Sequence, residues 1–224
     1  MTEPSAAEPT ALPGPWRRWA PWVAGGAAVA VTALGTRYEG LSGASRTDRV
    51  LEVAVASWVP DTVRGFWLVQ ALGNPATVIV MAGLLAAVAL AVGHRRLAVL
   101  AVVGPGLTGV ATTGLKPVFD RTLEGVPAYP SGHTAALTAL AIVTALLLIS
   151  IMRAGAATSV LLVLAAAFGA GTAMAIALTA LDIHYPTDTI GGFGTAVAVV
   201  LGTAAVLDRL ASARRLGAGR GVSS

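Results

Sequence analysis

Long apolar runs, separated by short polar segments, organise this chain. A helix needs about 20 mostly apolar residues to cross the hydrocarbon core of a bilayer. Six runs approach that length, and we expect each to form a membrane-spanning helix: residues 20–36, 75–93, 97–115, 134–151, 157–181 and 190–207. The pattern therefore predicts an all-α fold, an integral membrane bundle of six transmembrane helices.

The polar segments predict what surrounds this bundle. Residues 1–15 are rich in Pro, Ala and Glu, cannot bury a core, and are expected to form a disordered cytoplasmic tail. Residues 209–224 form a second, basic tail, so the six-span domain covers residues 16–208. Arg17 and Arg18 before the first apolar run also fit a signal peptide, but an uncleaved anchor is the favoured interpretation.

The connection between the first two runs is the longest. Residues 37–74 mix Trp58, Phe66 and Trp67 with charged residues. This mixture predicts one or two amphipathic helices at the membrane surface. A plain polar connector is the alternative.

Composition agrees with a membrane protein and removes several functional classes. Hydrophobic residues make up 55% of the 224 residues and charged residues 12%. The mean hydropathy of +0.76 is too apolar for an ordinary soluble domain. Without cysteine there is no disulfide framework, thiolate metal site or cysteine nucleophile. The net charge of +4 is not clustered as nucleic-acid binding requires, so no nucleic-acid partner is expected.

Basic residues predict the orientation of the spans. Nine Arg residues lie on the side that holds both termini, against six Lys or Arg residues on the opposite side. Positive charge concentrates in short cytoplasmic loops. Both termini should therefore be cytoplasmic, in a bacterial-type inner (cell) membrane, and the loops 116–133 and 182–189 should emerge together on the outer face.

These two outer loops contain nearly every group capable of chemistry. They hold Lys116, Asp120, Arg121, Ser131, His133, Asp182, His184 and Asp188. The chain has three histidines, and the third, His94, belongs to a basic turn on the cytoplasmic side. Catalysis, if present, is therefore expected on the outer face.

The second loop suggests a nucleophile. His184 and Asp188 are four residues apart, and Pro186 between them suits the first turn of a helix. A carboxylate that accepts one ring N–H leaves the other nitrogen a better nucleophile or base. The alternative is that Thr187 or Asp188 only caps the helix.

The first loop suggests an anion site. In Pro-Ser-Gly-His, Ser131 and Gly132 lie where free N–H groups and the positive end of a helix dipole favour an anion, and His133 can deliver a proton. Lys116 and Arg121, five residues apart, can converge on one phosphate. An N-cap serine and two snorkelling cations are the plainer alternatives. Together the two loops predict phosphoryl transfer through a phosphohistidine.

These residues resemble the type 2 phosphatidic acid phosphatase superfamily of integral membrane lipid phosphatases. That family carries Lys, six residues, Arg-Pro; then Pro-Ser-Gly-His; then Ser-Arg, five residues, His, three residues, Asp. The second motif is complete at 130–133, and the third is met by His184 and Asp188. The family's two arginines are replaced by Leu123 and Leu178.

The resemblance implies roles for each residue and no cofactor. His184 would attack phosphorus, Asp188 would orient it, and His133 would protonate the leaving lipid oxygen. The substrate phosphate would be bound by Lys116, Arg121, Ser131 and Gly132. The partner would be a phosphorylated lipid such as phosphatidic acid, phosphatidylglycerol phosphate or a polyprenyl (di)phosphate.

Three alternatives stay open at this stage. The missing arginines fit a catalytically silent protein of the same fold that binds lipid phosphate. A metal site on His133, His184 and Asp188 lacks an evident fourth ligand. A transporter is weaker, because the span 134–151 contains no charged residue.

Overall fold

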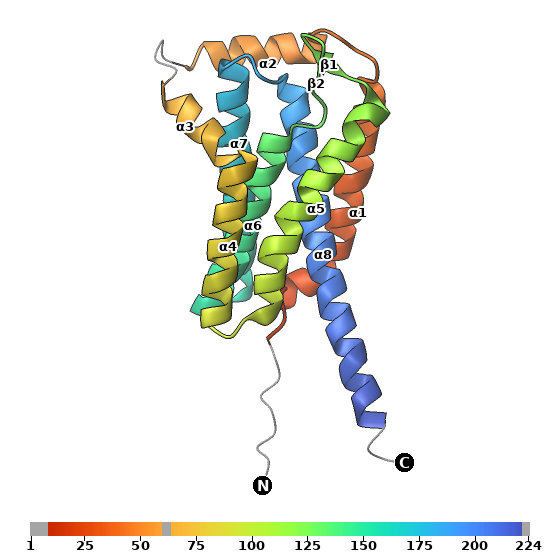
Figure 1. Ribbon diagram of the computed structural model, residues 1–224, viewed down its shortest axis with the longest axis vertical. Coiled ribbons are helices and arrows are strands. Elements are labelled where there is room, and N and C mark those ends of the chain that lie inside the picture. Colours follow the sequence, from red (N-terminus) through yellow and green to blue (C-terminus); the bar gives the residue numbers. More distant parts are fainter. Residues whose placement is uncertain (1–8, 60–63, 221–224) are drawn as a thin grey trace.

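The computed structural model describes residues 9–59 and 64–220 and is built almost entirely from helices (Figure 1). The helices are α1 (Gly14–Arg37), α2 (Arg46–Ala56), α3 (Arg64–Leu72), α4 (Pro75–Ala91), α5 (Arg95–Phe119), α6 (Gly132–Met152), α7 (Ala156–Ala180) and α8 (Pro186–Arg220). Two short antiparallel strands, β1 (Thr122–Leu123) and β2 (Val126–Pro127), join α5 to α6. The predicted all-α class is confirmed.

All six predicted apolar runs form helices, but six membrane spans are not confirmed. Among the described residues, four helices are long and apolar enough to cross a bilayer by themselves: α5, α6, α7 and α8 as far as Ala213. A fifth span results only if α3 and α4, which are bent by 57° at their junction, are counted together. Helices α1 and α4 do not qualify by themselves because of their composition and length, respectively. Helix α1 carries Pro21 inside and Arg37 at its end, and α4 has 17 residues.

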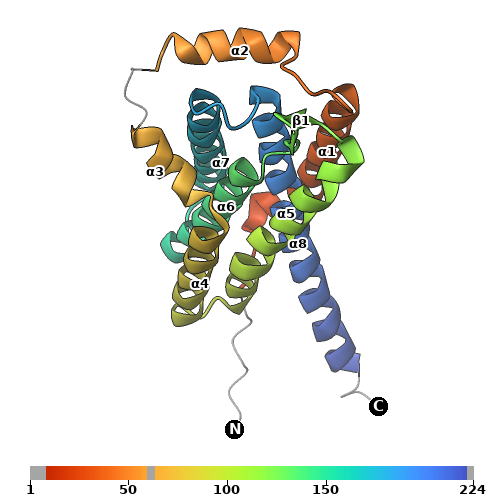
Figure 2. The same ribbon diagram turned by 45° about the horizontal axis from the view of Figure 1, so that its top comes forward.

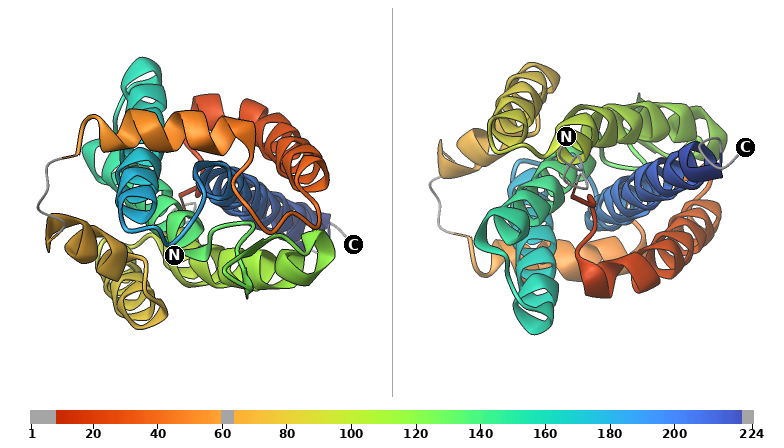
Figure 3. Two further views of the ribbon diagram at one scale, coloured as in Figure 1. Left: turned by 90° about the horizontal axis from the view of Figure 1, so that it is seen from above. Right: turned by 90° about the horizontal axis from the view of Figure 1, so that it is seen from below.

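The long connection between α1 and α4 contains two helices, as the sequence predicts. Ser45 and Asp48 start α2 with a reciprocal capping box, an arrangement that satisfies two backbone N–H groups at a helix start. Helix α2 then crosses the end of the bundle and contacts α7 and α8 (Figures 2 and 3). It covers the end at which both predicted site loops emerge (Figure 1).

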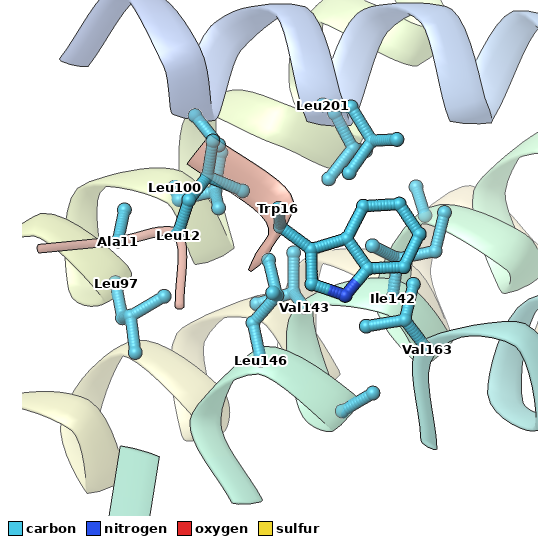
Figure 4. Close-up of a cluster of buried hydrophobic side chains, with 14 of the residues drawn as sticks. Ala11, Leu12, Trp16, Leu97, Leu100, Ile142, Val143, Leu146, Val163 and Leu201 are labelled. Atoms are coloured by element: carbon cyan, nitrogen blue, oxygen red, sulfur yellow. The ribbon is translucent and has the colours of Figure 1, made fainter. Parts of the chain in front are cut away.

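The N-terminal segment packs into the other end of the bundle, so ordered structure begins before the predicted boundary at residue 16. Ala11 and Leu12 are buried beside Trp16 in the main core (Figure 4). Their backbone N–H groups donate to the Asp208 carboxylate at 2.8 and 3.0 Å, and Arg96 pairs with it at 3.0 Å.

The other predicted boundaries fall partly outside the described residues. Residues 1–8 of the predicted first tail and 221–224 of the predicted second tail lie there. Up to Arg220 the second tail continues α8 as helix.

Glycines allow the two site loops to approach each other. A Cβ atom on Gly192 of α8 would collide with the Ser131 carbonyl oxygen, and one on Gly191 would collide with the Tyr129 ring. Because the Ser131 oxygen belongs to the backbone, it cannot rotate away. The start of α8 can therefore lie against the start of α6 only where α8 has no side chain.

We expect Gly192→Ala to destabilise the protein by about 1–3 kcal/mol, the usual cost of overpacking a core. Gly202→Ala in the same helix is the matched control, because its Cβ would lie an ordinary 3.9 Å from Ala24. This control should gain up to about 1 kcal/mol from helix propensity. Thermal unfolding in detergent measures both, and equal melting temperatures would contradict the close crossing.

Candidate active site

The two predicted site loops meet at one end of the bundle. The Ser131 N–H donates to the Asp188 carbonyl oxygen at 2.9 Å, which joins the start of α6 to the first turn of α8. His133 lies in the first turn of α6, and His184 lies in the loop just before α8. Their ring centroids are 6.5 Å apart. Two histidines that are 51 positions apart in the sequence (184 − 133) therefore face each other.

A cavity of about 990 Å³ adjoins these two rings. Four of the seven predicted site residues line it: Lys116, Gly132, His133 and His184. Two acidic residues, Glu124 and Asp182, line it as well. The other three predicted residues, Arg121, Ser131 and Asp188, are fully buried and lie behind this lining.

The start of α6 supplies the predicted anion site in part. Ser131 occupies the N-cap, and its hydroxyl accepts bonds from Thr134 of its own helix, from N–H at 3.4 Å and from Oγ1 at 3.1 Å. Gly132 lines the cavity at the positive end of the helix dipole. Lys116 lines it too, with Nζ donating to the Pro127 carbonyl oxygen at 2.7 Å. The hydroxyl of Ser131 thus caps its own helix, while Gly132 and Lys116 line the cavity.

Asp188 lies near His184 but is held by other groups. The distance from His184 Nδ1 to Asp188 Oδ2 is 3.6 Å, longer than a hydrogen bond. The same Oδ2 accepts the Tyr185 N–H at 3.2 Å, and Oδ1 pairs with Arg121 Nη1 at 2.8 Å. His184 Nδ1 is buried without a hydrogen-bond partner among the described residues. A small movement of the imidazole toward Asp188 would satisfy it.

Arg121 does not face the cavity beside Lys116. Its guanidinium is completely buried and pairs with Asp48 at 2.6 Å and with Asp188 at 2.8 Å. It donates to Thr187 Oγ1 at 2.6 Å. The rings of Tyr38 and Tyr185 stack on it at 4.7 and 4.8 Å. The predicted convergence of Lys116 and Arg121 on one phosphate is not present, because two buried carboxylates compete successfully for the arginine.

Asp48 is the main site residue that the sequence analysis missed. Besides Arg121, it accepts bonds from the Thr187 N–H at 3.0 Å and the Thr187 hydroxyl at 2.7 Å. Burial by itself would raise the pKa of Asp48, but hydrogen bonds from Ser45 and Thr187 outweigh burial and lower it. The Ser-x-x-Asp spacing predicts a capping box, and no local signal identifies Asp48 as the partner of an arginine in another loop.

The two positions at which the family motifs have arginine carry no substitute cation. Leu123 lines the cavity, and Leu178 is completely buried in α7. Within residues 9–59 and 64–220, Lys116 is the one Lys or Arg that lines the cavity. In the same part of the chain, no group of three or more His, Cys, Asp or Glu is placed to hold a metal ion.

Comparison with known proteins identifies one matching family. The model of the PAP2 superfamily matches residues 109–211. Over this segment the chain is similar to the PAP2 superfamily, which agrees with the resemblance of its motifs. The matched PAP2 region runs from the second half of α5 into α8 and contains every predicted site residue from Lys116 to Asp188. No curated protein and no solved structure matches this chain. Similarity to the PAP2 superfamily suggests phosphatase activity on phosphate esters.

We expect Asp48→Asn to lower the free energy of unfolding by about 1.5–3 kcal/mol, because it removes a buried charge-assisted bond and leaves Arg121 with Asp188 as its remaining ion-pair partner. Glu52→Gln on the same helix is the control, since this side chain is only partly buried. Thermal unfolding in detergent measures both. Similar melting temperatures for the two variants would contradict a buried pair.

The same ion pair predicts a pH dependence. A carboxylate with a lowered pKa stabilises the fold fully above its ordinary value, here 3.8, and this stabilisation is lost as the pH falls below it. The parent's melting temperature should therefore fall between about pH 5 and pH 3. In Asp48→Asn this fall should be smaller, and parallel curves would assign the acid transition to other groups.

Proposed function

We propose that this protein hydrolyses a phosphate monoester or diphosphate of a membrane lipid through a phosphohistidine intermediate. The observation that carries the proposal is the facing pair His133 and His184 beside a cavity that continues between α4 and α5. The pair supplies the chemistry, and the cavity supplies a place for a hydrocarbon chain.

The spacing of the rings suits in-line transfer. A nucleophile must lie about 3 Å from phosphorus, and an acid about 3 Å from the leaving oxygen. Rings with centroids 6.5 Å apart are close enough for one tetrahedral group in the adjoining cavity to contact both of them. In the first step a bond forms from His184 nitrogen to phosphorus, the bond to the lipid oxygen breaks, and His133 gives this oxygen its proton. Water then attacks phosphorus, His133 takes the water's proton, and phosphate leaves His184.

The equatorial oxygens of the phosphoryl group need fixed positive charge. Lys116 and the backbone N–H groups at the start of α6, next to Gly132, are the groups in the cavity that supply it. We assign Arg121 a different role from direct phosphate binding: its pairing with Asp188 holds the carboxylate beside His184.

The lining of the cavity favours a lipid substrate. Apolar and small residues continue it along two helices: Val78, Ile79, Ala82 and Gly83 of α4, and Val102, Pro105, Gly106 and Gly109 of α5. A Cβ atom on Gly83, Gly106 or Gly109 would meet nothing within 4 Å. The groove is thus unobstructed by side chains at these glycines, as binding of an acyl or prenyl chain requires. The substrate would be phosphatidic acid, phosphatidylglycerol phosphate or a polyprenyl (di)phosphate.

The arrangement of the helices supports a membrane setting with the site at one surface. The start of α1 and the end of α8 lie at the end of the bundle opposite α2, β1 and β2 (Figure 1). We propose a bacterial-type inner membrane with both termini cytoplasmic and the site on the outer face, as the distribution of basic residues predicts.

A catalytically silent protein that binds lipid phosphate is the second candidate. The observation that favours it is the shortage of cations in the cavity, where Leu123 stands in place of an arginine and Arg121 is turned away. A site that binds phosphate with one lysine and a helix N-terminus has less electrostatic stabilisation to offer a transition state.

One assay separates the two candidates. Purified protein in detergent with EDTA is given phosphatidic acid, phosphatidylglycerol phosphate and polyprenyl diphosphate, and released phosphate is measured. We expect turnover that falls roughly 10³-fold or more in His184→Ala, because the nucleophile is lost. His94→Ala is the control, since His94 bonds Ser150 at 3.0 Å, away from the cavity. Inactivity of the parent on all three lipids would favour the silent candidate.

A second experiment tests the lipid groove. Gly109→Leu should lower kcat/KM for a long-chain phosphatidic acid by about tenfold or more, because each displaced methylene loses ~0.8 kcal/mol. Hydrolysis of p-nitrophenyl phosphate should not change. Gly114→Leu is the matched control, as this glycine also lies on α5 with open space around it but does not line the cavity. Equal losses on both substrates would contradict a groove for the chain.

A further inference from the structure

Two amide side chains from the junction of α3 and α4 hold His133. Gln70 Nε2 lies 2.9 Å from His133 Nε2, and Asn74 Oδ1 lies 3.0 Å from the same nitrogen. Gln70 Nε2 also donates to Asn74 Oδ1 at 3.1 Å, which closes a triangle of three polar groups. None of the motifs that carry the family resemblance includes these two amides.

The local structure indicates that Asn74 is placed for His133. Asn74 occupies the N-cap of α4, where an asparagine side chain normally accepts an N–H of its own helix. Its side chain makes no such bond. The preceding residue, Gly73, lies so close to α6 that a Cβ atom would stand 2.9 Å from the His133 carbonyl oxygen. The junction therefore fits against the first turn of α6 only with glycine at this position.

The amides reach the ring without reaching the cavity. Gly73, Pro75 and His133 line the cavity, whereas Gln70 and Asn74 do not. An effect of either amide on the reaction would consequently pass through His133 and not through direct contact with a phosphate or a lipid chain.

The chemistry of the pair suits a group that both gives and takes a proton. A carbonyl oxygen accepts from Nε2 when this nitrogen is protonated, and an amide N–H donates to it when it is not. Neither amide is charged. When the His133 ring loses its proton and becomes neutral, no unpaired charge therefore remains beside it. With Nε2 bound by both amides, Nδ1 is the nitrogen left for a substrate oxygen.

We infer that Gln70 and Asn74 are positioning residues that orient His133 as the proton donor to the leaving oxygen. The inference rests on the proposed phosphatase function. It adds the α3–α4 junction to a site otherwise built from α5, α6, α8 and Asp48 of α2.

The test uses leaving groups of different quality. A general acid contributes 10²–10⁴-fold where the leaving oxygen is a poor leaving group, as in phosphatidic acid, and little for p-nitrophenolate. Asn74→Leu should therefore lower kcat for dioctanoyl phosphatidic acid by roughly 10- to 100-fold and kcat for p-nitrophenyl phosphate by less than about threefold. KM for both should stay close to the parent's value, because Asn74 does not line the cavity.

Two further variants separate positioning from folding. Asn74→Asp keeps an acceptor oxygen for His133 but places a charge beside the ring, so its activity on phosphatidic acid should exceed that of Asn74→Leu, with a pH profile displaced to higher pH. Thr77→Val, in the first turn of α4, is the control and should behave like the parent. Asn74→Leu in a His133→Gln background should cause no further loss, since residues that act as one unit are not additive.

The outcomes distinguish this inference from the proposed function. A parent that is inactive on both substrates overturns both. If the parent is active and His133→Gln shows no dependence on the leaving group, His133 is not the acid and the inference fails. If His133→Gln does depend on the leaving group but Asn74→Leu affects both substrates equally, or neither, the inference fails while the proposed function stands.

Discussion

The buried guanidinium of Arg121 is the constraint on which the site depends. A charge enclosed by protein is costly unless it is paired, and Arg121 is paired with Asp48 of α2 and Asp188 of α8. Thr187 bonds both Arg121 and Asp48. One side chain thus ties the surface helix α2 and the end of α5 to the first turn of α8. Since His184 directly precedes this turn, its position follows from the same network.

That use of Arg121 changes how the cavity can bind phosphate. With Arg121 neutralised by carboxylates and Leu123 in the lining, Lys116 and the start of α6 are the positive groups that the described part of the chain brings to the cavity. Binding energy from parts of a substrate that do not react can be used to hold the reacting group. The groove between α4 and α5 offers such energy to a lipid. A weakly cationic phosphate site beside a long apolar groove is therefore consistent with a membrane lipid and less suited to a small soluble phosphate.

The sequence predicted the helices and the meeting of the two loops, but not the partners of the site residues. Apolar runs located the long helices because burial depends on local composition, although α8 continues past the predicted end at residue 207 to Arg220. The spacing from His184 to Asp188 is local as well. Asp48 escaped prediction because it is 73 residues from Arg121. Gln70 and Asn74 escaped because the 57° bend that brings them to His133 leaves no periodic signal.

The number of spans was harder to predict for a related reason. The length of an apolar run indicates whether one helix can cross a bilayer by itself. Helix α4 reaches that length only together with α3, from which it is separated by a bend. The bend has a structural purpose that length does not reveal. It turns α3 toward α7 at the side of the bundle, so that the polar side chains at the junction lie beside α6.

The two histidines are consequently supported in different ways. His184 belongs to a network of buried charges between elements that cross closely, where Gly192 lies against the Ser131 backbone. His133 is held by neutral amides from α3 and from the N-cap of α4, the helix that lines the groove. A nucleophile that forms a covalent bond benefits from a fixed position. A proton donor must tolerate both of its charge states, and uncharged partners permit this. Under the proposed mechanism, the α3–α4 junction, at the start of the same helix that lines the groove for the lipid chain, would orient the acid.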